Sequence, residues 1–228
     1  MLKRRTRTRT PVPGPAARRS LGLAVLGLAL SVLGLGCPFD TRDPVAPGSS
    51  TGFCDGSKPP AQTPALLRDR IGRALECRLL DSDYFDSLDE QFTYTPDANS
   101  VAHAGPLFFL GWSRDRELTV MQQALAGSAA TRPLKVTVRF LLYRPNGLGT
   151  ADRPRYDVQY TMNLLLPDST QVRYGGCADW ELTGVNSPPV RLRTWADINP
   201  FEVGGCTPAE PVSAGVGTSG FLRFDRGQ

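Results

Sequence analysis

Residues 156–182 read YDVQYTMNLLLPDSTQVRYGGCADWEL, and this stretch decides the fold. Apolar and polar side chains alternate up to residue 164 and again from residue 172, with the turn sequence PDST between the two runs. Alternation with period two is typical of a strand that has one solvated face. The stretch therefore predicts two strands joined by a turn, and the small residues of the second strand allow it to bend strongly.

Two further runs with period two flank this pair, at residues 135–142 and 190–196. Before Gly127 the period is helical instead. Thr63 and Pro64 are suited to begin a helix, and apolar residues then recur at every fourth position. A chain that runs from helices to a meander of strands predicts an α+β fold, with the N-terminal helices packed on a curved antiparallel sheet.

Two shorter helices are expected between the first helix and the meander. Asp83 is placed to cap the earlier one, which presents Tyr84 and Phe85, and Ser113 is placed to cap the later one. A strand is expected between them at residues 92–95, because aromatic residues and threonines alternate there.

The N-terminus predicts export. Seven Lys and Arg residues precede position 21, and residues 21–36 carry no charge, which is the order of a secretory signal peptide. Sixteen residues are short for a membrane-spanning helix, although an uncleaved anchor is the alternative. The sequence LGLGC at residues 33–37 resembles a bacterial lipobox. We therefore predict a signal peptide at residues 1–36, a lipid on Cys37 and attachment to a membrane of the bacterial envelope, facing the periplasm or the outer surface.

The net charge of +4 comes from this leader. Without its seven cations, 19 of the 26 basic residues remain against 22 acidic ones. A slightly acidic body argues against nucleic acid as a partner, because that partner requires clustered Lys and Arg.

The cysteines support the lipid assignment. Five is an odd number, and an exported protein tends to pair its thiols. Setting Cys37 aside leaves an even set that allows three connectivities. We favour Cys54 with Cys77 and Cys177 with Cys206, with free thiols as the alternative. No C-x-x-C pair is present and His103 is the only histidine, so neither a metal nor a cofactor is expected.

Glycine and proline delimit the domain. Residues 37–62 are rich in both and are expected to form a flexible tether, followed by a domain at residues 63–200. Residues 201–228 are expected to form a loose tail. The apolar sequence FLRF at residues 221–224 either docks on the domain or frays.

Several segments resemble nuclear transport factor 2-like (SnoaL-like, cystatin-like cone) domains. They are ALECRLLD at residues 74–81, YFDSLDEQFTY at 84–94, WSRDRE at 112–117, GGCADWEL at 175–182 and LRTWAD at 192–197. The resemblance implies a curved sheet wrapped around the first helix, with an opening between sheet and helices. It implies no single function, because that superfamily includes isomerases, dehydratases, cyclases, transport adaptors and domains without chemistry.

Candidate functional residues fall into three groups. Five aromatic residues are expected to line an apolar pocket: Tyr94, Trp112, Tyr160, Tyr174 and Trp180. His103, in an expected loop, would be a general base if Asp97 or Asp86 oriented it. Four arginines are expected to form a basic stripe on the outer sheet face, either solvated or covered by a dimer or partner protein: Arg139, Arg173, Arg191 and Arg193.

Because no catalytic motif is present, we predict a non-catalytic cone domain on an exported, lipid-anchored protein, binding a small apolar ligand or a partner protein. One alternative is an isomerase, cyclase or hydrolase that uses His103 or Asp86 with Tyr94. Another is a structural role in assembly of the envelope.

Overall fold

The computed structural model describes residues 52–198 and 217–227. The predicted signal peptide, Cys37, the first part of the tether and Cys206 lie outside these residues. The described elements begin with helix α1 (Pro64–Cys77), a π-helical turn η1 (Leu80–Tyr84) and a short α2 (Phe85–Ser87). Strand β1 (Leu88–Thr95) follows, and then come helices α3 (Ala98–Ala104), α4 (Pro106–Phe109) and α5 (Arg114–Ala126).

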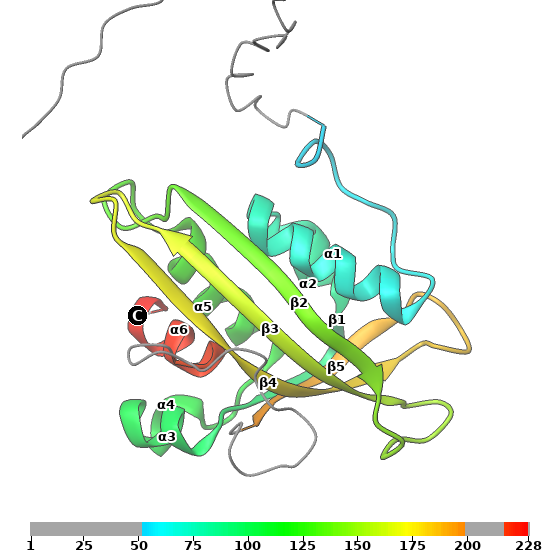
Figure 1. Cartoon of the computed structure of the whole chain (residues 1–228). Helices are drawn as coiled ribbons and strands as arrows, with labels where there is room; N and C mark the ends of the chain where they lie inside the picture. The colour runs from blue at the N-terminus through cyan, green and yellow to red at the C-terminus, as the bar shows by residue number, and fades with distance from the viewer. Residues whose placement is uncertain (1–51, 199–216, 228) are drawn as a thin grey trace, which may run out of the picture. The chain divides into compact units, whose positions relative to one another are not determined.

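The remaining strands come after α5, as the change of period predicts. They are β2 (Lys135–Pro145), β3 (Arg155–Leu165), β4 (Gln171–Thr183) and β5 (Arg191–Ile198), and a last helix, α6 (Ser219–Arg226), closes the described chain. The predicted α+β class, with N-terminal helices on a curved sheet, is confirmed. Figure 1 shows α1 lying along β2, while α6 lies beside α5 and β4.

Helix α1 begins as the sequence predicts, since the Thr63 side chain accepts a hydrogen bond from the Leu66 amide. Its apolar stripe, which includes Leu67 and Ile71, is fully buried. Gly72 allows the helix to approach β2 closely: a Cβ at this position would lie 3.1 Å from the Phe140 ring. Ser113 caps α5 by accepting from the Arg116 amide, as predicted.

The sheet has the strand order β1-β5-β4-β3-β2. Strands β2 to β5 form the predicted antiparallel meander, but β1 pairs with β5 in parallel, so the sheet is mixed. The parallel pair arises because the chain leaves β1 through three helices and three strands before β5 returns beside it. The register shifts in three of the pairings, so these ladders are irregular, and bulges at such points increase the bend of a sheet.

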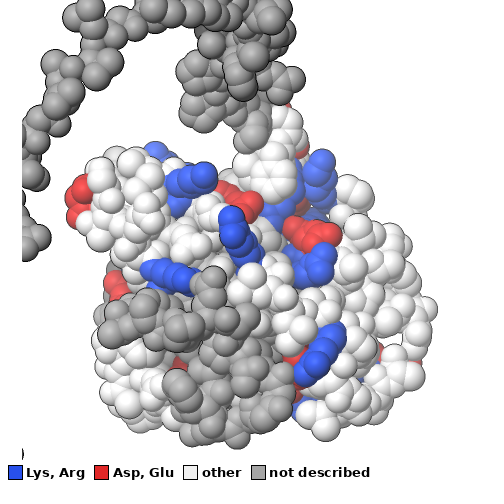
Figure 2. All heavy atoms as spheres, viewed as in Figure 1, with Lys and Arg blue, Asp and Glu red and all other residues white. Residues whose placement is uncertain are grey.

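The outer face of the sheet is less solvated than the alternation suggests. Gln159, Thr161, Cys177 and Asp179 occupy predicted polar positions of β3 and β4, yet all four are buried. Both faces of these strands are therefore covered in their central parts. Acidic and basic side chains are interspersed on the face seen in Figure 2.

The expectation of a loose C-terminal tail is wrong for residues 219–226. They form α6, whose Leu222 is fully buried in the core. The β4 residue Tyr174 pairs with Gly217 just before this helix. The apolar sequence thus docks on the domain, because its side chains reach a surface that only the folded sheet and helices create.

The described part of the predicted tether, residues 52–62, is attached to α1. Residues 52–62 contain no regular helix or strand, but Cys54 forms a disulfide with Cys77 at the end of α1, which confirms the favoured pairing. Cys177 is disulfide-bonded as well; its pairing with Cys206 stays a prediction, because Cys206 lies outside the described residues. Within the described ranges, no helix is both long and apolar enough to cross a membrane.

Candidate functional site

The interior between sheet and helices, where the sequence predicts a pocket, holds a buried ion pair. Arg223 of α6 meets Glu117 of α5, with Nη2 2.6 Å from Oε1 and Nε 2.9 Å from Oε2. The guanidinium carbon lies 4.0 Å from the centre of the Tyr94 ring. Tyr84 and Trp112 also donate to the Glu117 carboxylate, at 2.5 and 2.8 Å. Both oxygens of Glu117 are therefore engaged, and α6 supplies the counter-ion.

A second buried carboxylate, that of Asp197 at the end of β5, also holds α6. It accepts hydrogen bonds of 2.6–3.1 Å from Tyr94, Tyr160, Trp195, Ser219 and the Gly220 amide. The Tyr160 hydroxyl in turn accepts from the Ser219 amide at 2.8 Å. The start of α6 is thus anchored on the residues that were expected to face a ligand.

Burial keeps these phenols protonated. It raises the pKa of Tyr84, Tyr94 and Tyr160 well above the ordinary tyrosine value, and the neighbouring Glu117 and Asp197 raise it further. Burial also raises the pKa of Asp197, although Arg223 and the hydrogen bonds act in the opposite direction. Among the described residues, these tyrosines donate to Glu117 and Asp197, whose carboxylates are already hydrogen-bonded.

The five predicted pocket residues are all buried. Tyr94, Trp112 and Tyr160 converge on the two interior carboxylates. Trp180 packs against Trp195 and Phe140 instead, with ring centres 4.9 and 5.4 Å apart. The structure therefore places these side chains in the core and in the contact with α6. Their role as a ligand pocket stays a prediction.

His103 and Asp86, the candidate catalytic residues of the enzymatic alternative, have other partners. His103 lies in α3, which Asp97 caps, so the expected loop is wrong. Its Nε2 is 2.7 Å from Asp225 of α6 and its ring stacks on Phe221. The Asp86 carboxylate lies 3.7 Å from Arg70. Helix α6 was not predicted from the sequence. Its Asp225 supplies the carboxylate beside His103 that we expected Asp97 or Asp86 to supply.

The predicted basic stripe is partly neutralised. Arg193 lies 3.6 Å from Asp89 and 3.5 Å from Glu181, and it donates to Gln91 at 2.5 Å. Whether a partner covers this face of the sheet stays a prediction.

A groove lies elsewhere, between the N-terminal segment and α1. Its volume is about 380 Å³, and much of its lining is apolar: Phe53, Pro59, Pro60, Ala61 and Leu66. Phe53 and Leu66 remain half exposed, at 49% and 51%. A volume of this size is within the range of small-molecule sites. A more open hollow of about 520 Å³ shares Phe53, Asp69 and Arg73 with the groove and is also lined by Arg68 and Glu76.

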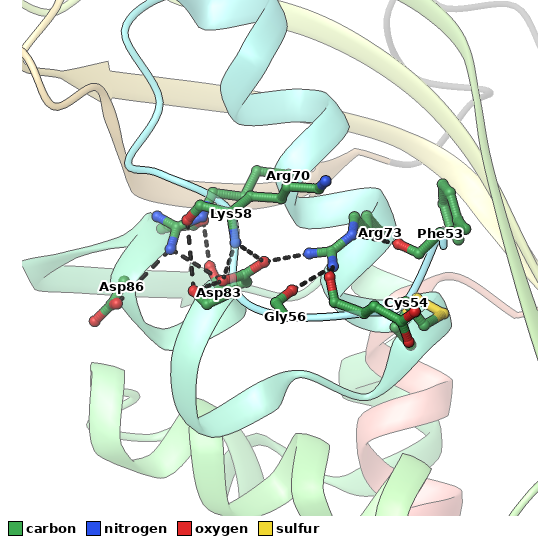
Figure 3. Close-up of polar contacts among 12 residues, drawn as sticks. Phe53, Cys54, Gly56, Lys58, Arg70, Arg73, Asp83 and Asp86 are labelled. Carbon is green, nitrogen blue, oxygen red and sulfur yellow. Dashed lines mark hydrogen bonds and ion pairs between the residues drawn. A yellow bond between two sulfur atoms is a disulfide. The ribbon is translucent and has the colours of Figure 1, made fainter. Parts of the chain in front are cut away.

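A buried aspartate holds the groove wall in place (Figure 3). Asp83 of η1 forms ion pairs with two arginines of α1, Arg73 at 2.5 Å and Arg70 at 3.2 Å. Ser57 and the Lys58 amide also donate to it. Although burial acts to raise the pKa of Asp83, these hydrogen bonds and the arginines outweigh burial and lower it. Asp83 was predicted to cap a helix; it instead ties the wall segment to α1.

Arg73 fixes the same wall through backbone oxygens. Its guanidinium donates to the carbonyls of Phe53, Asp55 and Gly56 at 2.5–3.2 Å, as Figure 3 shows for Phe53 and Gly56. Together with the disulfide, these bonds hold one side of the groove against α1 without any regular secondary structure. Sequence reasoning missed the groove, because its wall reads as a tether of glycine and proline.

The fold and these two sites define an α+β domain whose last described helix, α6, packs on the interior residues, and which carries an apolar groove beside α1. No protein-family model matches the chain, and no curated protein matches it. Among solved structures, a Kribbella flavida protein, Kfla4162, aligns with 58% of this chain and 84% of its own at 12% identity and a TM-score of 0.46.

Two enzymes align to a similar extent. The beta subunit of benzoate 1,2-dioxygenase from Burkholderia mallei is 9% identical over 61% of this chain and 91% of its own, with a TM-score of 0.45. The Delta 5-3-ketosteroid isomerase from Mycobacterium sp. is 7% identical over 58% of this chain and 89% of its own, with a TM-score of 0.42. Similarity at this level assigns no activity.

Proposed function

We propose that this chain is an exported, lipid-anchored protein of a bacterial envelope, and that its nuclear transport factor 2-like domain binds a small apolar molecule without transforming it. The observation that carries the proposal is the contrast between the two sites. The interior carboxylates are saturated by hydrogen bonds and by Arg223, whereas the groove presents exposed apolar side chains. A non-catalytic binding role requires the second kind of site and not the first.

The leader sequence and the disulfide support the envelope location. Disulfides persist in oxidising compartments, and Cys54–Cys77 ties the segment that carries Phe53 to the end of α1. Intact-mass spectrometry of the protein extracted from membranes tests this part. We expect a mature N-terminus at Cys37 that carries a diacylglyceryl group, and a Cys37→Ser variant that lacks it. A full-length chain with reduced thiols in the cytosol would contradict the location.

Calorimetric titration with dodecanol tests the binding role. Leu66→Asp should weaken binding at least tenfold, because it puts a charge on the apolar floor of the groove. Position 66 lies in the first turn of α1, where an acidic residue favours the helix dipole, so the variant should fold. Leu148→Asp is the matched control, because Leu148 is 71% exposed and does not line the groove. Equal affinity of both variants and the wild type would contradict the proposal.

The enzymatic alternative is tested separately by His103→Ala and Asp86→Asn. Neither residue lines the groove. We therefore expect dodecanol affinity to be unchanged in both variants. If the wild type turns over a substrate and either variant does not, the result favours catalysis instead.

A further inference from the structure

The groove contains a buried guanidinium with an unused donor. Arg70 lines the groove and is only 5% exposed. Its Nη2 reaches Asp83 at 3.2 Å and Asp86 at 3.7 Å, but its Nε has no hydrogen-bond partner among the residues that the structure describes. A buried donor left without a partner costs about 1–3 kcal/mol. An acceptor that reached this buried nitrogen from the groove would recover part of that cost.

A second cation lies at the same place. Lys58 lines the groove, and its ammonium forms no ion pair with any described carboxylate. The acidic residue of the lining, Asp69, is already engaged, because it lies 2.6 Å from Arg68. Arg73 commits four of its five N–H donors to Asp83 and to three carbonyls. Lys58 therefore supplies a cation without an ion-pair partner among the described residues, and Arg70 contributes its unused Nε donor.

We propose that the groove binds a single-chain amphiphile with an anionic head group. The chain lies on Phe53, Pro60 and Leu66, and the head group accepts hydrogen bonds from Arg70 and Lys58. Guanidinium groups bind carboxylate or phosphate oxygens through charge-assisted hydrogen bonds, which are stronger than neutral ones. This assignment rests on the proposed function, since it names the ligand class of the same groove.

Three probes with the same twelve-carbon chain separate the head group from the chain: dodecanoate, dodecanol and dodecyltrimethylammonium. With the full-length protein in calorimetric titrations, we expect dodecanoate to bind at least tenfold more tightly than dodecanol, and the cationic probe to bind most weakly. Lys58→Gln should reduce the preference for dodecanoate over dodecanol several-fold. Lys135→Gln removes the same charge from an exposed position at the start of β2 and should leave that preference unchanged.

The outcomes separate the two proposals. Equal affinities for dodecanoate and dodecanol, both lost in Leu66→Asp, would overturn the anionic assignment and leave the apolar site standing. Absence of binding by all three probes would overturn both. If Leu66→Asp leaves dodecanoate affinity unchanged, the bound molecule lies outside the groove and the assignment is overturned. Association with phosphatidylglycerol vesicles without binding of monomeric dodecanoate would overturn it in favour of a membrane-facing surface.

Discussion

Arg223 compensates the buried charge of Glu117 in the interior. Both it and Glu117 are almost fully buried, and each satisfies the charge of the other. Removing one partner of a buried pair leaves an uncompensated charge, which typically costs about 3–5 kcal/mol. We therefore expect Arg223→Met to lower the free energy of unfolding by about that amount in urea titrations.

The exposed loop residue Arg153 provides the matched control, and Arg153→Met should change stability by less than about 0.5 kcal/mol. Adding Glu117→Gln to Arg223→Met should cost less than the sum of the two single changes, because the double variant no longer buries a lone charge. Additive costs would show that the ion pair does not hold α6.

Asp83 predicts a dependence of stability on pH. Its pKa in the folded protein is lower than in the unfolded chain, because hydrogen bonds and arginines favour the carboxylate. The stabilisation is therefore present above the unfolded value of about 3.9 and is lost as pH falls through the folded pKa. Urea titrations from pH 6 down to pH 3 should show the stability gap between wild type and Asp83→Asn narrowing below about pH 4.

Asp197 acts in the opposite direction, since its folded pKa is raised. Its contribution is fully present below the unfolded pKa and is lost as pH rises through the folded pKa. The pH profile of wild-type stability therefore combines two opposite contributions. The comparison of wild type with Asp83→Asn isolates the contribution of Asp83. A gap between wild type and variant that stays constant across this range would contradict the assignment of Asp83.

Residue identity alone predicted the caps at Thr63 and Ser113, but it predicted a wrong cap at Asp83 and gave no sign of the buried ion pairs. Thr63 and Ser113 were identifiable because capping depends on neighbouring backbone amides. Asp83 and Arg223 find their partners through tertiary contacts. The only sequence signal for Arg223 was an arginine inside an apolar run near the C-terminus, which fits a surface residue equally well.

At the scale of elements, the Cys54–Cys77 disulfide supports the groove wall. It closes a loop with a sequence separation of 23 residues, for which chain entropy predicts a stabilisation of about 3 kcal/mol. We expect the Cys54→Ser, Cys77→Ser double variant to lose about this amount. It should also bind dodecanol more weakly, because Phe53 is no longer fixed beside α1.

Calorimetric titration beside urea unfolding checks both effects. Retained dodecanol affinity in the destabilised double variant would show that the bonds from Arg73 and Asp83 hold the wall unaided. Loss of affinity at full stability would point to a direct contact of the disulfide with the ligand. We predict that the dodecanol affinity and the free energy of unfolding both decrease in the double variant.

The strands and long helices were predictable because each carries its own periodicity, from α1 to β5. Helix α6 was not, since its eight residues, Ser219–Arg226, are too few for a periodic signal and follow a glycine-rich stretch. Its docking depends on Asp197 and Glu117, which come from distant elements. The parallel pairing of β1 with β5 is likewise a property of the assembled sheet.

At the scale of the whole molecule, helix α6 packs on the interior residues, and the groove that we propose as the ligand site lies between α1 and the segment before it. Sequence reasoning located the pocket among the aromatic residues of the interior. It could not detect that α6 occupies the neighbouring space, because nothing local links residue 223 to residue 117. The groove is built from a segment without periodicity, so composition alone indicated only a tether there.

The most direct test of this arrangement is a titration of the ¹⁵N-labelled protein with dodecanol, followed by amide and indole N–H resonances. Trp112, Trp180 and Trp195 all lie in the interior and report on it. We predict chemical-shift changes confined to amides of residues 53–73, with the three indole signals unmoved. Movement of the Trp112 and Trp195 indole signals without change at residues 53–66 would place the ligand in the interior and contradict the account.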